Sequence, residues 1–294
     1  MVWIVNYESA NHIVACLSSL SGSAVDEIFI LDNSSSEADR AKLARIEDAN
    51  TTVFYSSTNL GFGGGHNEIA RRVPPAHDDI VWLLNPDTIV PEDTPALLVA
   101  VIESGEAEIV SPLIESRRDD VNRIWFSGGR IDIRRGHVED SQLGRDPVAV
   151  SQAQRLLNTE FITGAAPMMR RGTWDTLGGF REDLFLYWED VELSLRAQER
   201  GFSMAVLTTA KIFHLEGGSS VGVRSTRSRA YFYMSRNRIL VCRRPFSRGF
   251  SLVLGPGTIG LARFAGHAMF REGGGRGARA LAIARGAVEA LRTE

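Results

Sequence analysis

The first half of the chain alternates short apolar runs with amphipathic stretches of helical period. Five runs have the length and the β-branched or aromatic content of strands: residues 2–6, 27–31, 52–56, 80–84 and 108–112. Between them, residues 9–20 and 37–48 have helical patterns, and a glycine-rich stretch at 59–67 precedes a short helix. Strands that alternate with helices predict βαβ units and a doubly wound, mostly parallel sheet of the α/β class.

The pattern changes near residue 117. Two hairpin-like pieces at 124–130 and 131–139 are followed by a polar stretch at 140–154 and a second ordered block at 161–215. An Arg-rich tail comes after Glu216. We therefore expect a main domain and a basic, helical C-terminal extension. Their expected bounds are 1–220, with halves of about 1–115 and 116–220, and 221–294.

Polar residues follow the predicted strands at the points where those strands end. They are Asn6-Tyr7, Asp32-Asn33, Asn59 and Asn85-Pro86-Asp87. In doubly wound sheets, ligands bind beyond the carboxyl ends of the strands. The sequence therefore predicts a ligand site at this edge of the sheet.

The charge of the chain is unevenly distributed. The 33 basic and 36 acidic side chains give a formal net charge of −3. Residues 217–294 hold 14 Arg against three acids, a local charge of +11, while the first 216 residues carry −14. Such asymmetry suggests an anionic partner for the tail.

Composition excludes several classes of protein. A hydrophobic content of 44% argues against disorder, and two cysteines cannot form a disulfide framework. The first residues enter a strand-like run without a secretory signal, so we expect a cytoplasmic protein. The apolar stretch 249–266 is broken by Gly255-Pro256-Gly257 and Arg263, which makes a transmembrane helix an unfavourable interpretation.

Three segments carry candidate chemistry, and each also has a plain structural interpretation. Asp87, after an apolar run, could hold Mg²⁺ or Mn²⁺ on a substrate phosphate, although Asn-Pro and Asp also favour ordinary turns. Acidic Glu189 and Asp190 follow an aromatic group that includes Trp188. The aromatic group could serve as a sugar wall, and a carboxylate at the helix start could serve as a general base. The acidic residues could also only complement the helix dipole. His214, which ends a late apolar run, would suit a metal site if it met Asp87.

Taken in order, these segments resemble the family 2 glycosyltransferases of the GT-A fold, especially the rhamnosyltransferase-like branch. The resemblance covers about residues 1–240. The matching pieces are residues 4–7, 16–20, 31–35, 59–67, 84–87, 164–165, 179–196, His214 and 231–238. Three positions depart from the family pattern: Glu8, Asn85 and His66.

The resemblance implies a role for each matching residue. Asp190 would be the catalytic base, and Asp87 with His214 would hold a divalent cation, Mg²⁺ or Mn²⁺. Gly164, Trp188 and Glu189 would form the acceptor or sugar wall. The nucleotide-sugar site would comprise Asn6, Tyr7, Asp32, Asn59, Gly61, Asn67, Asn85 and Asp87.

The implied activity is inverting, metal-assisted sugar transfer from a nucleoside-diphosphate sugar, with dTDP-L-rhamnose as the leading donor. The acceptor would be a glycan, a lipid-linked glycan or a metabolite, as in cell wall or polysaccharide synthesis. The first half would bind the donor and the second half the acceptor. The alternatives are a nicotinamide-dependent oxidoreductase, although the first strand lacks its glycine fingerprint, and a nucleic-acid-binding protein acting through the tail.

The family resemblance changes the interpretation of the Arg-rich tail. No nucleic acid is expected as a partner. The first part of the tail would be an acceptor-side element in which Arg224, Arg227 or Arg229 meets a diphosphate. Residues 250–285 could rest on an anionic membrane surface, giving a cytoplasmic protein that is peripheral on the inner face.

Overall fold

The computed structural model describes residues 1–74, 76–118, 121–140, 142–215, 224–243, 262, 264–266 and 275–293; for 117–118 and 224–227 it describes the backbone alone. The elements up to α4 are β1 (Val2–Asn6), α1 (Ala10–Leu20), β2 (Ile28–Asp32), α2 (Glu37–Leu43), β3 (Thr51–Tyr55), α3 (Gly61–Arg72), β4 (Ile80–Leu83), β5 (Thr88–Ile89) and α4 (Thr94–Ser104). The expected order of strands and helices in this half is confirmed.

The second half contains shorter elements. They are β6 (Ile109–Arg118), β7 (Val121–Phe126), β8 (Arg130–Asp132), β9 (His137–Glu139), α5 (Pro147–Ala153), β10 (Leu156–Asn158), β11 (Met168–Arg170), α6 (Arg171–Leu177), the 3-10 helix η1 (Glu182–Leu184), α7 (Glu189–Glu199), β12 (Met204–His214), α8 (Arg224–Cys242) and α11 (Arg276–Arg292). Hairpin-like pieces were expected at 124–130 and 131–139. In the structure, β8 and β9 form a short hairpin, whereas β7 pairs with the preceding strand β6.

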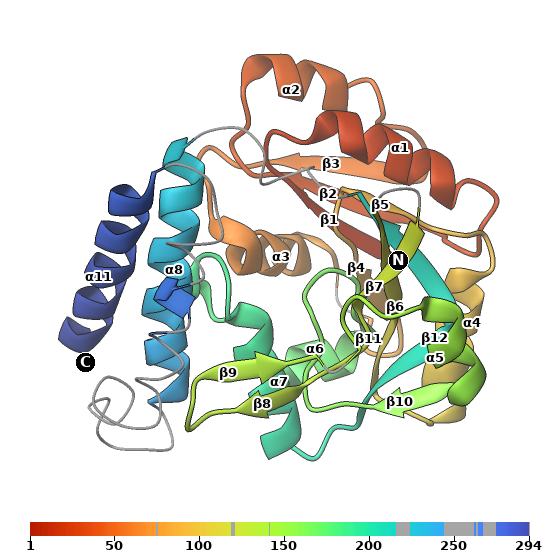
Figure 1. The fold of residues 1–294 in the computed structure, drawn as a ribbon. Coiled ribbons are helices and arrows are strands. Elements are labelled where there is room, and N and C mark those ends of the chain that lie inside the picture. Colours follow the sequence, from red (N-terminus) through yellow and green to blue (C-terminus); the bar gives the residue numbers. More distant parts are fainter. Residues whose placement is uncertain are drawn as a thin grey trace.

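One large sheet organises the molecule (Figure 1), with the strand order β10-β12-β6-β11-β4-β1-β2-β3. β4, β1, β2 and β3 run parallel, and β12 is parallel to β6. Between these two groups lies β11, which is antiparallel to both β4 and β6. The doubly wound α/β class is therefore confirmed, with an antiparallel strand at its centre.

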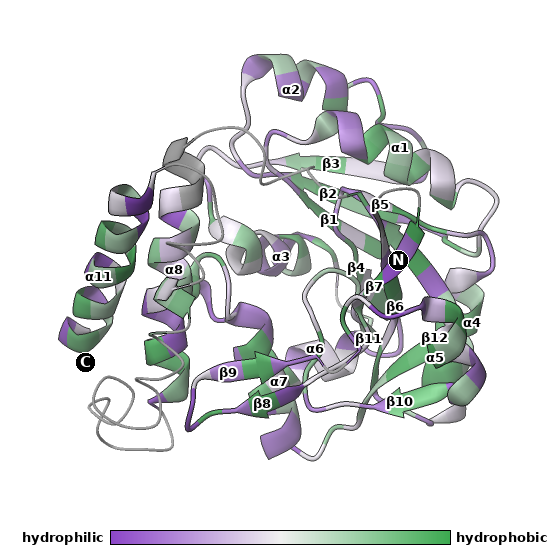
Figure 2. Ribbon diagram, in the orientation of Figure 1, coloured by the Kyte–Doolittle hydropathy of each residue, from purple (hydrophilic) through white to green (hydrophobic). Residues whose placement is uncertain are grey.

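The core follows the hydrophobic pattern of the sequence. Central strands are largely hydrophobic in Figure 2, and Trp3, Ile4 and Trp82 are almost fully buried. Helix α4 ends at Gly105 in the left-handed conformation, and Asp146 accepts a hydrogen bond from Val148 N (2.9 Å) at the start of α5. The glycine and the capping aspartate define one end of each helix more closely than the apolar pattern does.

Helices α8 and α11 pack against each other at one side of the molecule (Figure 1). Gly286 of α11 lies so close to the Phe232 carbonyl of α8 that a Cβ there would clash with it. Arg243 donates to the carbonyl of Ala290 (2.9 Å). The expected helical extension is present in these described ranges. Among the described helices, none is long and apolar enough to cross a membrane.

Candidate active site

The ends of β1 and β2 are joined by a buried polar network. Asn6 Nδ2 lies within hydrogen-bond distance of Asp32 Oδ1 (3.1 Å), Ser35 Oγ (3.0 Å) and Asp39 Oδ2 (2.9 Å). Asp32 also forms an ion pair with Arg40, with 2.7 Å between Oδ2 and Nε. Both Asn6 and Asp32 are fully buried, so these contacts hold the strand ends in register.

Tyr7 differs from its buried neighbours in this corner. It follows Asn6 directly and is 49% exposed, which leaves its ring accessible beyond the end of β1. Of the three residues expected here, Tyr7 is therefore the one whose side chain faces solvent. An aromatic ring at the carboxyl edge of the sheet can pack against a nucleotide base.

A second network surrounds Asn59 and Gly61. Asn33 Nδ2 donates to Asn59 Oδ1 (3.1 Å) and to the Gly61 carbonyl (2.9 Å), and its Oδ1 accepts from Leu60 N (2.7 Å). Gly61 has φ +77°, and a Cβ there would clash with the Phe185 carbonyl. Only glycine satisfies both constraints. This network joins the start of α3 to the loop before α7.

Asn67 makes contacts within the protein. Its Nδ2 donates to the Phe180 carbonyl (2.8 Å) and to Glu182 Oε1 (2.9 Å), and its Oδ1 accepts from Phe180 N (2.9 Å). These three bonds tie α3 to the segment that leads into η1. Asn67 therefore supports the site by holding α3 and the segment at 180–182 together.

The structure brings Asp87 and His214 together. Strand β5 pairs with β12 so that Thr88 lies opposite His214, and Leu215 N donates to the Asp87 carbonyl (2.8 Å). His214 Nε2 lies 3.4 Å from Asp87 Oδ1. The ring of Trp125, from β7, stacks on His214 with 4.6 Å between centroids and 9° between planes.

This pair has the donor atoms of a divalent cation site. A carboxylate oxygen and an imidazole nitrogen suit Mn²⁺, and Mg²⁺ and Mn²⁺ commonly bind through few protein ligands plus substrate phosphate oxygens. His214 Nδ1 is buried and has no hydrogen-bond partner among the described residues. In the same residues, no group of three or more His, Cys, Asp or Glu side chains could hold a metal by itself. The residues fit a cation that a substrate diphosphate completes.

The acidic pair at the start of α7 faces the centre of the site. Asp190 Oδ2 accepts from Gly164 N (3.2 Å), and its Oδ1 accepts from Val191 N (2.8 Å). Burial raises the pKa of Asp190. Burial, together with the charge of Asp190, raises the pKa of Glu189 well above its ordinary value. The two backbone N–H groups on Asp190 favour its ionised form and partly oppose the effect of burial.

Hydrogen bonds connect this acidic pair to the end of β4. Asn85 N donates to the Ala165 carbonyl (2.8 Å), and the preceding residue, Gly164, donates to Asp190. A Cβ at Gly164 would lie 2.8 Å from the ring of Phe62, so this position has room for glycine alone. The segment at 164–165 thus links the residues before Asp87 to Asp190.

The loop before α7 has an unusual backbone. Phe185, Tyr187 and Trp188 all have left-handed φ angles, of 66°, 66° and 70°. Such angles cost non-glycine residues roughly 1–2 kcal/mol each and persist only where the surroundings enforce them. This loop therefore needs external support to present Glu189 and Asp190.

Helix α8 provides this support. Nδ2 of the fully buried Asn237 lies within hydrogen-bond distance of the carbonyls of Leu184 (2.7 Å), Leu186 (2.9 Å) and Tyr187 (2.8 Å). The guanidinium of Arg236 donates to the Asp183 carbonyl. Neither residue was expected at the site from the sequence. Asn237 lies within the matching segment 231–238, which is the signal that could have found it.

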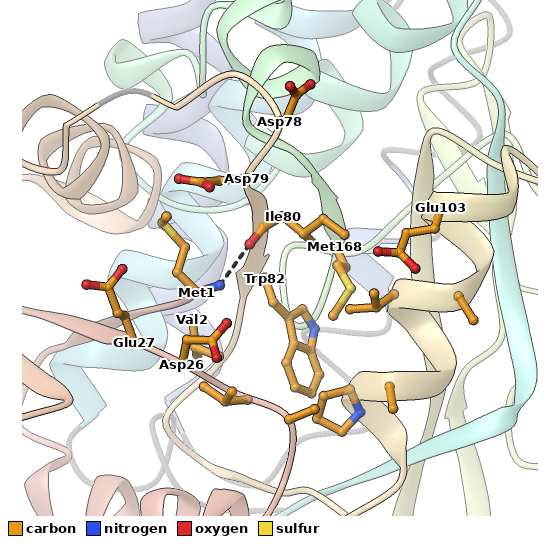
Figure 3. A pocket seen from close by; sticks show the side chains of 16 residues that line it. Met1, Val2, Asp26, Glu27, Asp78, Asp79, Ile80, Trp82, Glu103 and Met168 are labelled. Carbon is orange, nitrogen blue, oxygen red and sulfur yellow. Dashed lines mark hydrogen bonds between the residues drawn. The ribbon is translucent and has the colours of Figure 1, made fainter.

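Another cavity among the described residues lies at the opposite edge of the sheet. It has a volume of about 530 Å³ and is lined by the starts of β1, β2 and β4 together with α4. Figure 3 shows Asp26, Glu27, Asp78, Asp79 and Glu103 around it, and the Met1 amino group donating to the Ile80 carbonyl (2.8 Å). Since ligands of doubly wound sheets bind at the carboxyl ends of strands, this cavity is not the expected site.

Part of the tail lies outside the described residues. The side chains of Arg224 and Arg227 and most of residues 250–274 belong to that part. Arg229 is exposed on α8. The expectations for diphosphate and membrane contacts of the tail therefore rest on the sequence alone.

Comparisons with known proteins identify the family of this chain. The family model described as glycosyltransferase like family 2 matches residues 1–233. The low-salt glycan biosynthesis hexosyltransferase Agl10 of Haloferax volcanii is 25% identical over 248 residues, covering 83% of this chain and 76% of that protein. The N-acetylglucosaminyl-diphospho-decaprenol L-rhamnosyltransferase of Mycobacterium tuberculosis is 26% identical over 236 residues, covering 74% of this chain and 76% of that protein.

Solved structures show the same fold. The crystal structure of GalNAc-T7 with UDP, GalNAc and Mn²⁺ matches with a TM-score of 0.65 at 14% identity. The match covers 96% of this chain and 53% of that one, so this chain spans about half the length of GalNAc-T7. The family match decides against the oxidoreductase and nucleic-acid-binding alternatives. The chain belongs to the family 2 glycosyltransferases and has their GT-A fold.

Proposed function

We propose that the chain is an inverting glycosyltransferase that moves a sugar from a nucleoside-diphosphate sugar to an acceptor hydroxyl. dTDP-L-rhamnose is the proposed donor, because the mycobacterial relative is named an L-rhamnosyltransferase. The same name describes an acceptor sugar on a lipid diphosphate, which supports a lipid-linked glycan as acceptor here. Such an acceptor would bring the chain to the inner face of the membrane as a peripheral protein.

One observation carries the proposal. The Asp87–His214 pair and Asp190 belong to segments far apart in the sequence, and the 164–165 segment connects them by hydrogen bonds to Asn85 N and Asp190 Oδ2. These hydrogen bonds support a diphosphate site at Asp87 and His214 and a proton-accepting site at Asp190 that belong to one active site. Single displacement needs both in the same active site.

Each of the chain's own residues then has a defined task. Asp190 accepts the proton of the acceptor hydroxyl as that hydroxyl attacks the anomeric carbon, and the N–H groups of Gly164 and Val191 hold its carboxylate in place. Asp87 and His214 would hold the divalent cation, which when bound neutralises charge on the departing nucleoside diphosphate. Tyr7 contacts the nucleotide base, while Asn6, Asp32 and Asn59 shape the base and ribose pocket.

Release of nucleoside diphosphate tests this proposal. The purified chain is incubated with dTDP-L-rhamnose, UDP-N-acetylglucosamine and GDP-mannose, with Mn²⁺, with Mg²⁺ or with EDTA. We expect release from one donor that EDTA abolishes. Asp190→Asn should lower turnover about 10²–10⁴-fold, the usual contribution of a general base, yet still gain thermal stability from the donor.

The control is Asp78→Asn, a nearly fully exposed carboxylate at the opposite edge of the sheet. It should leave turnover unchanged. Near wild-type turnover in Asp190→Asn would show that Asp190 is not the base, and activity that persists in EDTA would contradict the cation site.

A further inference from the structure

A second, smaller cavity adjoins Asp190. It has a volume of about 280 Å³ and is lined by the β8–β9 turn, the loop before α7, α8 and the short helical segment at 264–266. Most of its wall is apolar or aromatic, formed by Phe161, Tyr187, Trp188, Met234 and Phe264. Asp190 is the acidic side chain in this lining.

The cavity has a fixed shape, because its walls are bonded to one another. Arg238 of α8 donates to the carbonyls of Gly136 (2.6 Å) and Arg135 (2.6 Å), joining α8 to the β8–β9 turn. The ring of Phe264 packs on Tyr231 of α8, with 5.5 Å between centroids. The side chain of Asn237 donates to the Tyr187 carbonyl (2.8 Å), which fixes the cavity wall formed by the loop before α7. Three elements thus meet around the space through specific contacts.

The chemistry of the walls indicates the occupant. A volume of about 280 Å³ lies at the lower end of the range for ligand pockets, roughly 300–1,000 Å³, and accommodates a single ring rather than an extended chain. Aromatic walls match the apolar C–H face of a pyranose, and a carboxylate at one end matches a hydroxyl group. Arg238 directs Nε and Nη2 to backbone carbonyls, so its guanidinium is used mainly to join the walls.

We propose that Met234 and Phe264 determine which pyranose ring this cavity accepts when the reacting hydroxyl of the acceptor lies at Asp190. The inference rests on the proposed function, in which Asp190 is the base. Both selecting residues lie beyond residue 233, where the family match ends. The other walls, Phe161, Tyr187 and Trp188, lie within the matched residues.

The test separates acceptor binding from donor turnover. Met234→Trp fills the cavity, and Phe264→Ala opens it. The probes are the methyl pyranosides of glucose, galactose, mannose and N-acetylglucosamine. For each variant we measure donor hydrolysis without acceptor, the stimulation of nucleoside-diphosphate release by each probe, and probe binding by saturation-transfer difference NMR.

We expect at least one probe to bind the wild type and to stimulate release. Met234→Trp should abolish binding and stimulation while donor hydrolysis stays within twofold, and Phe264→Ala should raise the KM for the probe tenfold or more. Leu281→Trp, on the exposed face of α11, is the matched control and should behave as wild type. Melting temperatures confirm that each variant is folded.

Different failures have different meanings. Absence of release from every donor would refute the proposed function itself. Normal donor hydrolysis with unchanged probe binding in Met234→Trp would refute the acceptor cavity alone. Failure of all four pyranosides to bind the wild type would refute the sugar-ring assignment, and equal loss of donor hydrolysis in Met234→Trp would assign the cavity to the donor.

Discussion

At the scale of single residues, two adjacent carboxyl groups at the start of α7 are made unequal by their surroundings. Asp190 receives hydrogen bonds from two backbone N–H groups, whereas Glu189 Oε2 is buried without a hydrogen-bond partner among the described residues. Both pKa values are raised by burial, that of Glu189 more strongly. The carboxyl group that receives the hydrogen bonds is that of Asp190, the residue that we assign as the base.

Glu189→Gln tests this unequal pair. A carboxyl group with a raised pKa in the folded state binds more protons folded than unfolded, so its stability contribution falls as pH rises above the unfolded value of about 4.5. The glutamine amide does not titrate, so the variant lacks this fall in stability with rising pH. We expect equal stability of variant and wild type at pH 4 and a variant more stable by roughly 1–3 kcal/mol at pH 8, the usual cost of an unpaired buried polar group.

Urea unfolding at pH 4 and pH 8 measures this difference. Glu103→Gln, an exposed glutamate on α4, is the control and should show no such pH dependence. A variant that is less stable than wild type at pH 8 would mean that ionised Glu189 is stabilised in the folded protein. The same variant should retain turnover at neutral pH.

The residues of the site differ in how far the sequence could predict them. Asp87 and His214 were expected as a pair, and the structure places them 3.4 Å apart, because Asp87 directly precedes β5, which pairs with the end of β12. Trp125 and Asn237 were missed. Their roles depend on contacts with residues about 50 to 90 positions away, which no local pattern encodes.

At the scale of elements, the apolar periods located most strands and helices within a few residues. Strand β11 escaped prediction because it has three residues, and its place between β4 and β6 is decided by tertiary pairing. Helix α5 lies within a stretch expected to be polar and irregular. Its start, with Asp146 as cap and Pro147 in the first turn, carries a helix signal that the apolar pattern does not show.

The hydrogen bonds between α8 and the loop at 184–188 support the backbone that precedes Glu189 and Asp190. Asn237→Asp removes two N–H donors at nearly constant size and turns acceptor oxygens toward the carbonyls of Leu184, Leu186 and Tyr187. The strained loop then loses its support, and Asp190 moves. We expect turnover to fall about 10–100-fold, since displacements near 1 Å have effects of that size.

Separate measurement of KM and kcat distinguishes this effect from general damage. The KM for the donor should stay within twofold, because the proposed nucleotide contacts lie at the ends of β1, β2 and β3. Asn11→Asp, exposed on α1, is the matched control and should have wild-type kinetics. Equal effects on donor KM and kcat would show that Asn237 supports the whole fold and has no particular role in positioning Asp190.

At the scale of the whole molecule, the sheet interleaves the two halves that the sequence suggests. Strand β11, from the second half, inserts between β4 and β6, with Met168 paired to Trp82 on one side and Val110 on the other. Trp82 Nε1 donates to the Ala166 carbonyl (3.0 Å), and Leu83 N donates to the Pro167 carbonyl (3.0 Å). The first half, residues 1–115, thus completes its core with residues of the second half.

This interleaving predicts that residues 1–118 do not fold alone. Without β7, β11 and β12, strand β4 keeps only β1 as a neighbour and β6 loses all of its partners. Buried side chains such as Trp82 and Ile109 then become exposed at about 1.5–3 kcal/mol each. Several such losses exceed a typical stability of about 5–15 kcal/mol. The isolated fragment should lack native circular dichroism and NMR dispersion, and co-expression with residues 119–294 should restore both. A well-dispersed spectrum from 1–118 alone would instead make the donor-side half an independent domain, and the hydrogen bonds through residues 164–165 would then join two domains rather than brace one core.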